Sequence, residues 1–494
     1  MEKLMWIFMY NQMQFYKIII AILFCILCLV PNHMFSQNIP ENIKTLMDTL
    51  PVLSNDHGDR ELLYQYSVGD LSSLSDEDTR KVISGLKNRG VGVITFWKKG
   101  EKIDSHIQEG IRIARIQKEL GLSVVIDATR LLYGFYDGTP ATSHISDKGE
   151  TFSDSSFAGH TMGCPFTLVS RIPVIEARIV AYAEAYKAAG IDIDIVTADW
   201  EIDGPMEWND AWENSKSCVR CRENTSDINN FLLFQATLRS IRSRLMYESY
   251  TKPVLERFPD ALITNYATYP HDGWRYWYDY FEYPQPELPH IKDQNALYRP
   301  WYDEFAETGF TLAMPVVYTW YPIFNWYPEY SGDYRWFYNM LKVGSNAGKS
   351  TPSGIPLATF VHWHTTAPPK NPDPGVKQMS RESYQELLWH LLLRGHDMLF
   401  SWCMQNELAV EMILLQDVYN KSLEYNKWFK IGQPVIFDVP ANETTVISGI
   451  KLNNKVLVRR TDFKENNKPV MVKIDNVELK VPCKPGECQI LRLE

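Results

Sequence analysis

Eight apolar runs, each rich in β-branched or aromatic residues, recur along the chain and are short enough to be buried strands. Longer segments with helical spacing of apolar residues separate most of them. The clearest helical patterns cover residues 103–120, 172–189, 228–247 and 380–394. The predicted strands are residues 62–68, 91–97, 122–128, 193–201, 261–269, 311–320, 357–364 and 398–403.

This alternation predicts an α/β fold, a (β/α)8 TIM-type barrel with long loops over residues 37–432. A doubly wound open sheet is the alternative. No Gly-rich phosphate loop follows any of the predicted strands, which weakens that alternative. We therefore expect the barrel, with its active site where the strands end, at their carboxyl side.

The two ends of the chain differ from the middle in their pattern of apolar and polar residues. Residues 433–494 show short alternating runs broken by turn signals, which predicts a small, sandwich-like C-terminal domain of antiparallel strands. Residues 18–30 carry no charge, Gly or Pro and are too short to span a bilayer. They predict a signal peptide over residues 1–36, with an uncleaved signal anchor as the alternative. We expect an exported protein (periplasm, cell surface or medium) with no membrane span after cleavage.

Composition narrows the class of partner. The 494 residues include 60 acidic and 50 basic side chains, a net charge of −10, and 13% are aromatic. An acidic chain is a poor match for nucleic acid, which binds basic surfaces. Many aromatic rings favour stacking on flat, neutral faces such as those of sugars. We expect a polysaccharide or glycan partner and no cofactor, and the pattern does not indicate an oligomeric state.

Six cysteines follow the predicted signal peptide. Cys218 and Cys221 are separated by two residues, and Cys483 and Cys488 by four, so each pair could close a small loop in an oxidising compartment. A zinc site would need two such pairs held together, and the second pair has the wrong spacing. Local disulfides are therefore predicted in preference to a metal, with Cys164 and Cys403 unassigned.

The candidate chemistry is concentrated at the end of the fourth predicted strand, which closes with Asp199, Trp200 and Glu201. Because side chains alternate along a strand, the two carboxylates share a face. Neighbouring carboxylates do not both ionise freely, so one keeps a proton and suits general-acid work. Glu201 is the predicted proton donor. A pair of solvated acids at the start of a loop is the structural alternative.

Polar and aromatic residues also close the other strands. His362 and His364 share a face and could hold a metal, but no carboxylate ligand stands at the usual spacing, so sugar binding or packing is favoured. The set as a whole predicts a deep, ring-lined carbohydrate cleft around one acid pair. The predicted substrate-binding residues are Asp127, Asn265, Tyr266, Tyr269, Tyr318, Trp320, His362, His364 and Trp402.

Glycoside hydrolysis needs a proton donor and a group that stabilises an oxocarbenium-like centre. In a substrate-assisted, retaining mechanism, Asp199 orients a 2-acetamido group and Tyr318 helps to hold it. In a two-carboxylate mechanism, Glu407 is the nucleophile. The alternatives outside this class are a non-catalytic carbohydrate-binding barrel and a metal-dependent hydrolase built on His362 and His364.

The segment that ends in Asp199-Trp200-Glu201 resembles the D-x-E motif shared by the hyaluronidase family and the chitinase-like glycosidases. Residues 314–318 are similar to the hyaluronidase Pro-x-x-Tyr, residues 265–270 to its aromatic fifth strand end, and residues 401–407 to its Trp-bearing eighth strand. The resemblance implies a barrel glycosidase. In it, Asp199 positions an acetamido group, Glu201 is the acid/base, and Tyr318 and Trp402 line the catalytic subsite.

Two features depart from the hyaluronidase pattern. Residues 202–205 differ from the extension that follows the motif in that family, and the cysteine positions differ as well. An acidic protein would also need a local basic path for polyanionic hyaluronan, and Arg275, Arg299 and Arg335 are the candidates. The resemblance therefore implies a barrel glycosidase without implying a substrate.

Overall fold

The computed structural model describes residues 39–132, 139–154, 161, 163–199, 210–266, 301–318, 324, 327–364 and 375–493. Residues 40–494 form one compact unit. The predicted signal peptide, residues 1–36, lies outside the described residues.

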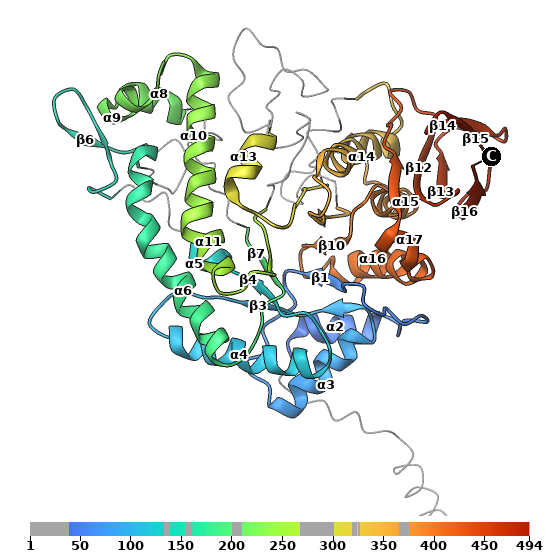
Figure 1. Cartoon of the computed structure of the whole chain (residues 1–494), viewed down its shortest axis with the longest axis horizontal. Helices are drawn as coiled ribbons and strands as arrows, with labels where there is room; N and C mark the ends of the chain where they lie inside the picture. The colour runs from blue at the N-terminus through green and yellow to red at the C-terminus, as the bar shows by residue number, and fades with distance from the viewer. Residues whose placement is uncertain are drawn as a thin grey trace, which may run out of the picture. The chain divides into compact units, whose positions relative to one another are not determined.

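Two parallel sheets of four strands each form the centre of this unit (Figure 1). Their strands are buried, which is why they read in the sequence as nearly continuous apolar runs. The first sheet has the order β2–β1–β10–β9, with β1 at Leu63–Gln65, β2 at Val91–Gly92, β9 at Ala358–Val361 and β10 at Met398–Ser401. The second has the order β3–β4–β7–β8, with β3 at Ile94–Phe96, β4 at Val125–Asp127, β7 at Ile195–Thr197 and β8 at Leu262–Ile263.

An extended segment connects β8 of the second sheet to β9 of the first. The carbonyl of Ile263 in β8 accepts hydrogen bonds of 3.2 Å from the amides of residues 311 and 312. Further along, Ala313 forms a parallel bridge to Leu357, the residue before β9, and Val316 forms one to Phe360 within β9. Pro315 lies between them and has no N–H to donate, so the bridges stay isolated and do not form a continuous ladder. Within the predicted strand at 311–320, residues 311–318 are therefore an extended segment between β8 and β9, and residues 319 and 320 lie outside the described residues.

Helices follow the parallel strands and confirm the predicted α/β alternation. The segments expected at 103–120, 172–189, 228–247 and 380–394 are α4, α6, α10 and α15. Helix α3 begins after Ser75, whose hydroxyl accepts the amide of Asp78 at 3.1 Å and caps the first turn. The helices run as α2 Glu41–Thr49, α3 Asp76–Lys87, α4 Ile103–Glu119, α5 Thr129–Leu132, α6 Ile172–Ala188, α8 Asp210–Lys216, α9 Val219–Asn224, α10 Phe231–Met246, α11 Lys252–Leu255, α13 Trp301–Thr308, α14 Gly332–Ser350, α15 Arg381–Leu392, α16 Leu408–Ser422 and α17 Asn426–Ile431.

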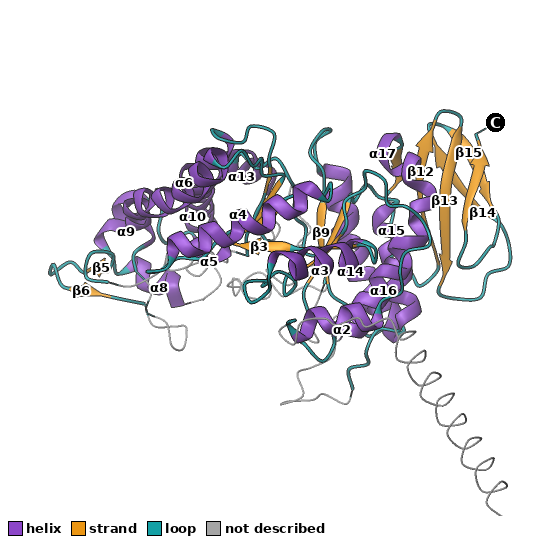
Figure 2. Cartoon of the chain, turned by 90° about the horizontal axis from the view of Figure 1, so that it is seen from below, coloured by secondary structure: helices purple, strands orange, loops and turns teal. Residues whose placement is uncertain are grey.

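The C-terminal segment is antiparallel, as predicted (Figure 2). Asp475 and Asn476 join β14 to β15 with φ of 49° and 70°, the positive values of a two-residue hairpin turn, which Asp and Asn tolerate. The four-stranded sheet has the order β11–β12–β13–β16, with β11 at Gln433–Ile436, β12 at Thr445–Leu452, β13 at Lys455–Asp462 and β16 at Cys488–Arg492, beside the hairpin of β14 at Val470–Ile474 and β15 at Val477–Val481.

Buried polar groups at the end of α15 hold this sheet. Arg394 is fully buried and donates from Nε to the hydroxyl of Ser448 at 2.7 Å and from Nη2 to the carbonyl of Asp438 at 2.9 Å. Burial lowers the pKa of Arg394 to about 9. The ring of His390 lies 2.7 Å from the hydroxyl of Ser448 and 2.9 Å from that of Thr461. The C-terminal strands therefore satisfy polar groups that the helix layer buries.

An aromatic cluster fills the space beneath the strand ends. The ring of Phe360 in β9 lies 5.0 Å from that of Tyr66, which follows β1. It lies 5.8 Å from Tyr266, which follows β8, and 5.7 Å from Tyr318, at the end of the extended segment. Three tyrosine rings from different strand ends thus meet around the ring of Phe360. Among the helices in the described part of the chain, none combines the length and hydropathy that crossing a membrane requires.

The predicted disulfide between Cys218 and Cys221 is not supported, because both residues have free thiols. Cys218 precedes α9 and Cys221 lies one turn inside it, and both thiols are directed at Cys164. The sulfur of Cys164 is 3.6 Å from that of Cys221 and 3.9 Å from that of Cys218. A disulfide needs about 2.05 Å.

The predicted disulfide between Cys483 and Cys488 is not supported either, since both thiols are free. The sulfur of Cys483 is 3.8 Å from the carboxylate of Asp462. The sulfur of Cys488 is 3.8 Å from Nη1 of Arg459. Each cysteine has its own polar neighbour on β13.

Candidate active site at the strand ends

Two carboxylates stand at the ends of neighbouring parallel strands, β4 and β7. Asp127 is the last residue of β4 and pairs in register with Thr197, two residues before Asp199. Thr129 links them: its amide donates to Oδ1 of Asp127 at 2.7 Å, and its hydroxyl accepts the amide of Asp199 at 2.7 Å. Asp127 is only 6% exposed, and this burial raises the pKa of its carboxyl. The strand register therefore brings both acids to one site.

Tyr66, which follows β1, completes this group and was not singled out in the sequence. Its hydroxyl is buried. Burial raises the pKa of Tyr66 well above its ordinary value, and the negative charge of Asp127 and then of Asp199 raises it further. The phenol therefore stays protonated beside two carboxylates, where it can donate a hydrogen bond. Its position at a strand end, within an aromatic run, is the signal that could have identified it.

A wall of rings lines the same region. The hydroxyls of Tyr266 and Tyr318 are 2.9 Å apart. The ring of Tyr318 meets that of Trp402 edge-on at 5.8 Å, and Trp402 stacks on His362 at 4.7 Å. Because the ring of Phe360 lies 5.0 Å from that of Tyr66 and 5.7 Å from that of Tyr318, the ring wall lies next to the acidic group.

The two predicted histidines are each close to a carboxylate from the start of α16. Nδ1 of His362 is 3.5 Å from Glu411, and Nε2 of His364 is 3.4 Å from Glu407. Glu411 is 1% exposed and also accepts the amide of Trp363 at 2.8 Å. Each imidazole therefore lies next to a carboxylate at the end of β9. The sequence predicts Glu407 as a site residue but not Glu411, which lies inside a helical pattern.

The structure places some of the remaining predicted residues, and others lie outside the described part of the chain. Asn265 is buried, 1% exposed, and its side-chain amide donates to the carbonyl of Tyr266 at 3.3 Å. Glu407 caps α16 and accepts the amide of Met404 at 3.2 Å. Arg335 donates to the carbonyls of residues 324, 328 and 330, so its guanidinium is used by the local loop and not by a basic path. Three predicted site residues, Glu201, Tyr269 and Trp320, lie outside the described residues.

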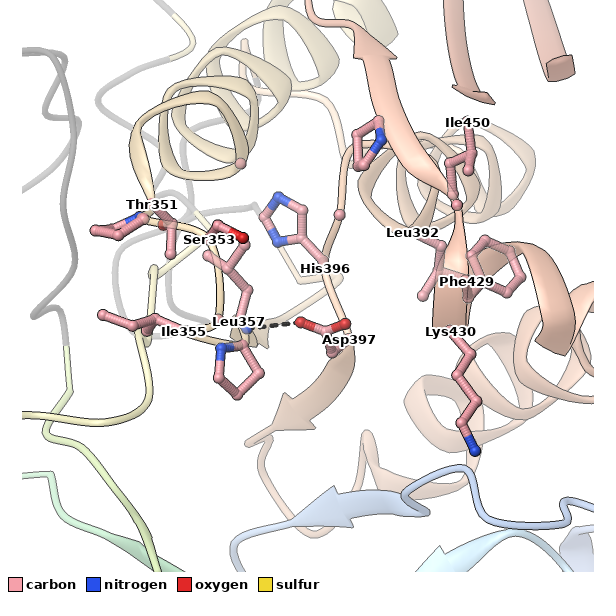
Figure 3. Close-up of a pocket in the computed structure, with 17 residues that line it drawn as sticks. Thr351, Ser353, Ile355, Leu357, Leu392, His396, Asp397, Phe429, Lys430 and Ile450 are labelled. Atoms are coloured by element: carbon pink, nitrogen blue, oxygen red, sulfur yellow. Dashed lines mark hydrogen bonds between the residues drawn. The ribbon is translucent and has the colours of Figure 1, made fainter. Parts of the chain in front are cut away.

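A cavity of about 440 Å³ lies at the opposite, amino ends of β9 and β10 (Figure 3). Asp397, which precedes β10, accepts the amide of Leu357 at 2.9 Å, and His396 lies beside it. Burial lowers the pKa of His396 to about 4. Residues of β11 and β12 also line this cavity, so it separates the parallel strands from the C-terminal sheet. None of the predicted substrate-binding residues lines it.

No protein-family model and no curated protein matches the sequence. Several similar solved structures are glycoside hydrolases, the class that the sequence predicts. An α-L-fucosidase from Paenibacillus thiaminolyticus aligns with 10% identity and a TM-score of 0.43, over 76% of this chain and 51% of its own. A family 36 α-galactosidase from Geobacillus stearothermophilus, in complex with raffinose, aligns with 10% identity and a TM-score of 0.43, over 91% and 57%.

An α-amylase from Geobacillus thermoleovorans, in complex with acarbose, aligns with 9% identity and a TM-score of 0.41, over 87% of this chain and 96% of its own. The chain spans about half the length of the fucosidase and the galactosidase. All three TM-scores are below 0.5. The function proposed below therefore rests on the residues at the strand ends.

Proposed function

We propose that this chain is a glycoside hydrolase whose parallel strands form a (β/α)8 barrel. The hydrogen bonds that lead from β8 through residues 311–317 to β9 support one ring of strands. The direct succession of β2 and β3 along the chain supports the same ring, because each belongs to a different sheet. In such a barrel the carboxyl ends of the strands carry the active site.

The observation that carries the proposal is the link from Asp127 through Thr129 to Asp199, beside the phenol of Tyr66. This combination of groups suits a sugar. The carboxylates and the phenol can form hydrogen bonds with sugar hydroxyls, and aromatic rings can stack on the apolar faces of the sugar. Glycoside hydrolysis in turn needs acids at the point where the leaving oxygen gains a proton.

In the proposed mechanism Glu201, two residues after Asp199, protonates the leaving oxygen and later activates water. Asp199 holds a 2-acetamido group of the substrate, whose carbonyl oxygen attacks the anomeric carbon, so that configuration is retained. Tyr318 donates a hydrogen bond to the same amide. The second candidate is a two-carboxylate mechanism in which Glu407 attacks the anomeric carbon. Glu407 follows β10 and lies 3.4 Å from Nε2 of His364, so it stands at a strand end beside another predicted site residue, which supports this second mechanism.

We also propose that the protein acts outside the cytoplasm on a polysaccharide or glycan. The apolar segment at residues 18–30 supports export. The proposed layout has the signal peptide at residues 1–36, the catalytic barrel at residues 37–432 and the C-terminal domain at residues 433–494.

The test is product release from a panel of polysaccharides by the wild type and by Glu201→Gln. The panel combines acetamido glycans (hyaluronan, chondroitin, chitin oligomers) with galactans, fucans and xylans. Glu201→Gln keeps the shape but removes the proton, so turnover should fall by about 10²-fold or more. Glu101→Gln, an exposed acid in a turn, is the matched control and should keep full activity. Near wild-type turnover in Glu201→Gln would contradict the donor assignment.

The same panel separates the two mechanisms. Cleavage restricted to acetamido glycans, with loss of activity in Asp199→Asn, supports substrate assistance. Cleavage of a glycan without an acetamido group, with loss of activity in Glu407→Gln, supports the carboxylate nucleophile. Binding without any cleavage would replace the hydrolase with a carbohydrate-binding protein.

A further inference from the structure

Four potential metal ligands converge in the loops that follow β4 and β7. His144 lies in the short strand β5, His144–Ile145, and Cys164 precedes the 3-10 helix η1, Pro165–Arg171. Cys218 and Cys221 lie at the start of α9. Their ligand atoms all lie within 4.8 Å of one another. Each side chain is at most 1% exposed.

The distances within this group match the edges of a small tetrahedron. Zinc binds thiolates at about 2.3 Å in tetrahedral sites, so two sulfur ligands of one ion should be about 3.8 Å apart. The sulfur of Cys164 is 3.6 Å from that of Cys221 and 3.9 Å from that of Cys218. Nδ1 of His144 is 3.8 Å from the sulfur of Cys221. These separations are too long for a disulfide and short enough for one shared ion.

The surroundings fix the ligands and exclude water. The ring of Phe152 stacks on that of His144 at 5.0 Å. The three cysteines pack in an apolar cluster with Ile228, Phe234 and Leu238. The guanidinium of Arg220 donates to the carbonyl of Ser143 at 3.1 Å, which ties α9 to the segment that carries His144. Apolar packing alone gives no reason for an imidazole to lie among three thiols. Three cysteines and one histidine are, however, a common ligand set of structural zinc sites.

We propose that His144, Cys164, Cys218 and Cys221 bind a structural Zn²⁺ ion. Binding as three thiolates and a neutral imidazole releases three thiol protons and completes a tetrahedron, so no position is left for a substrate or water. The ion joins the loop after Asp127 to the loop after Asp199 and so supports both strand ends. The sequence favoured disulfides because spacing shows only the Cys218–Cys221 pair. The other two ligands come from distant positions in the chain.

The first test is the metal content of the full chain, expressed in zinc-supplemented medium, purified and dialysed. We expect about one zinc per chain. Cys221→Ser should lose most of it, and Cys403→Ser, which removes a thiol outside the cluster, should keep it. Co²⁺ added to the reduced, zinc-free wild type should give the visible absorption of tetrahedral cobalt–thiolate coordination.

Two further measurements keep the proposal falsifiable if Cys221→Ser fails to fold. In the wild type, zinc should protect three thiols from alkylation, and a chelator should expose them. Mass spectrometry of the unreduced protein should find no disulfide among the three cysteines. Absence of bound zinc together with absence of the cobalt spectrum, or a disulfide within the cluster, would overturn the site. None of these readouts depends on glycosidase activity.

Discussion

His396 gives a stability prediction whose size follows from the structure. The residue is 2% exposed, its Nε2 donates to the carbonyl of Gly344 at 2.9 Å, and its Nδ1 accepts the hydroxyl of Thr359. Both ring nitrogens are thus satisfied in the neutral form. Burial, the largest cause, lowers the pKa of His396 from 6.5 to about 4. The folded protein therefore holds this ring neutral at pH values where the unfolded chain protonates it.

The sign and magnitude follow from proton linkage. Below pH 6.5 the unfolded chain binds a proton at this position and the folded protein does not, so stability falls as the pH decreases toward 4. At pH 4.5 the difference amounts to about 2.5 kcal/mol, from about 1.4 kcal/mol per pKa unit. In His396→Gln this contribution is absent. The loss of unfolding free energy between pH 7.5 and pH 4.5 should then be about 2.5 kcal/mol smaller than in the wild type.

Urea titrations of both proteins at the two pH values measure this difference directly. His57→Gln, at a half-exposed position in a surface turn, is the matched control and should behave as the wild type does. The absolute stability of His396→Gln is expected to fall at pH 7.5, because glutamine does not reproduce both hydrogen bonds, but this does not affect the comparison. Equal losses in wild type and His396→Gln would refute the argument that the ring is buried neutral.

Substitutions at three more positions test the described contacts. Thr129→Val removes the hydroxyl that accepts the amide of Asp199, so it should cost about 1–2 kcal/mol in urea unfolding and lower turnover, and Thr129→Ser should restore both. Glu411→Ala leaves the hydroxyl of Tyr384 and the amide of Trp363 without their acceptor, and we expect a loss of about 3 kcal/mol by the same titration. Glu386→Ala removes the partner of Arg459, whose side chain is 5% exposed, and a fall of about 3 kcal/mol in unfolding free energy is expected. A change below 1 kcal/mol would mean that this ion pair is not a buried one.

The parallel strands could be predicted because burial on both faces leaves a direct mark in the sequence. The runs around β4 and β10 are apolar and β-branched or aromatic, so they indicate strands without knowledge of their neighbours. The run at 311–320 looks equally strand-like, yet Pro315 removes one amide and leaves two isolated bridges. The local sequence pattern predicts that the backbone is extended, but it does not predict whether the segment forms a complete hydrogen-bond ladder with its neighbour.

The site could be predicted only where it follows from strand ends. Asp127 and Asp199 were identified in this way, and the register of β4 with β7 brings them to one place. Tyr66 follows β1, a position that the sequence could indicate, whereas the role of Glu411 comes from tertiary neighbours that the sequence does not display. The cysteine cluster was misread for the same reason. Proximity along the chain favoured Cys218 with Cys221, whereas the fold adds Cys164.

The polar contacts of Arg394 and His390 have a consequence for the evolution and engineering of this chain. The buried guanidinium of Arg394 takes most of its acceptors from residues 437–448 of the C-terminal segment, and one, the hydroxyl of Ser345, from α14. Loss of the C-terminal strands would remove those acceptors and uncover apolar residues that pack on the sheet, Leu393 among them. The C-terminal sheet is therefore not a detachable module to be exchanged or deleted. We expect a chain cut at residue 432 to be insoluble, because the junction between α15 and this sheet is then incomplete.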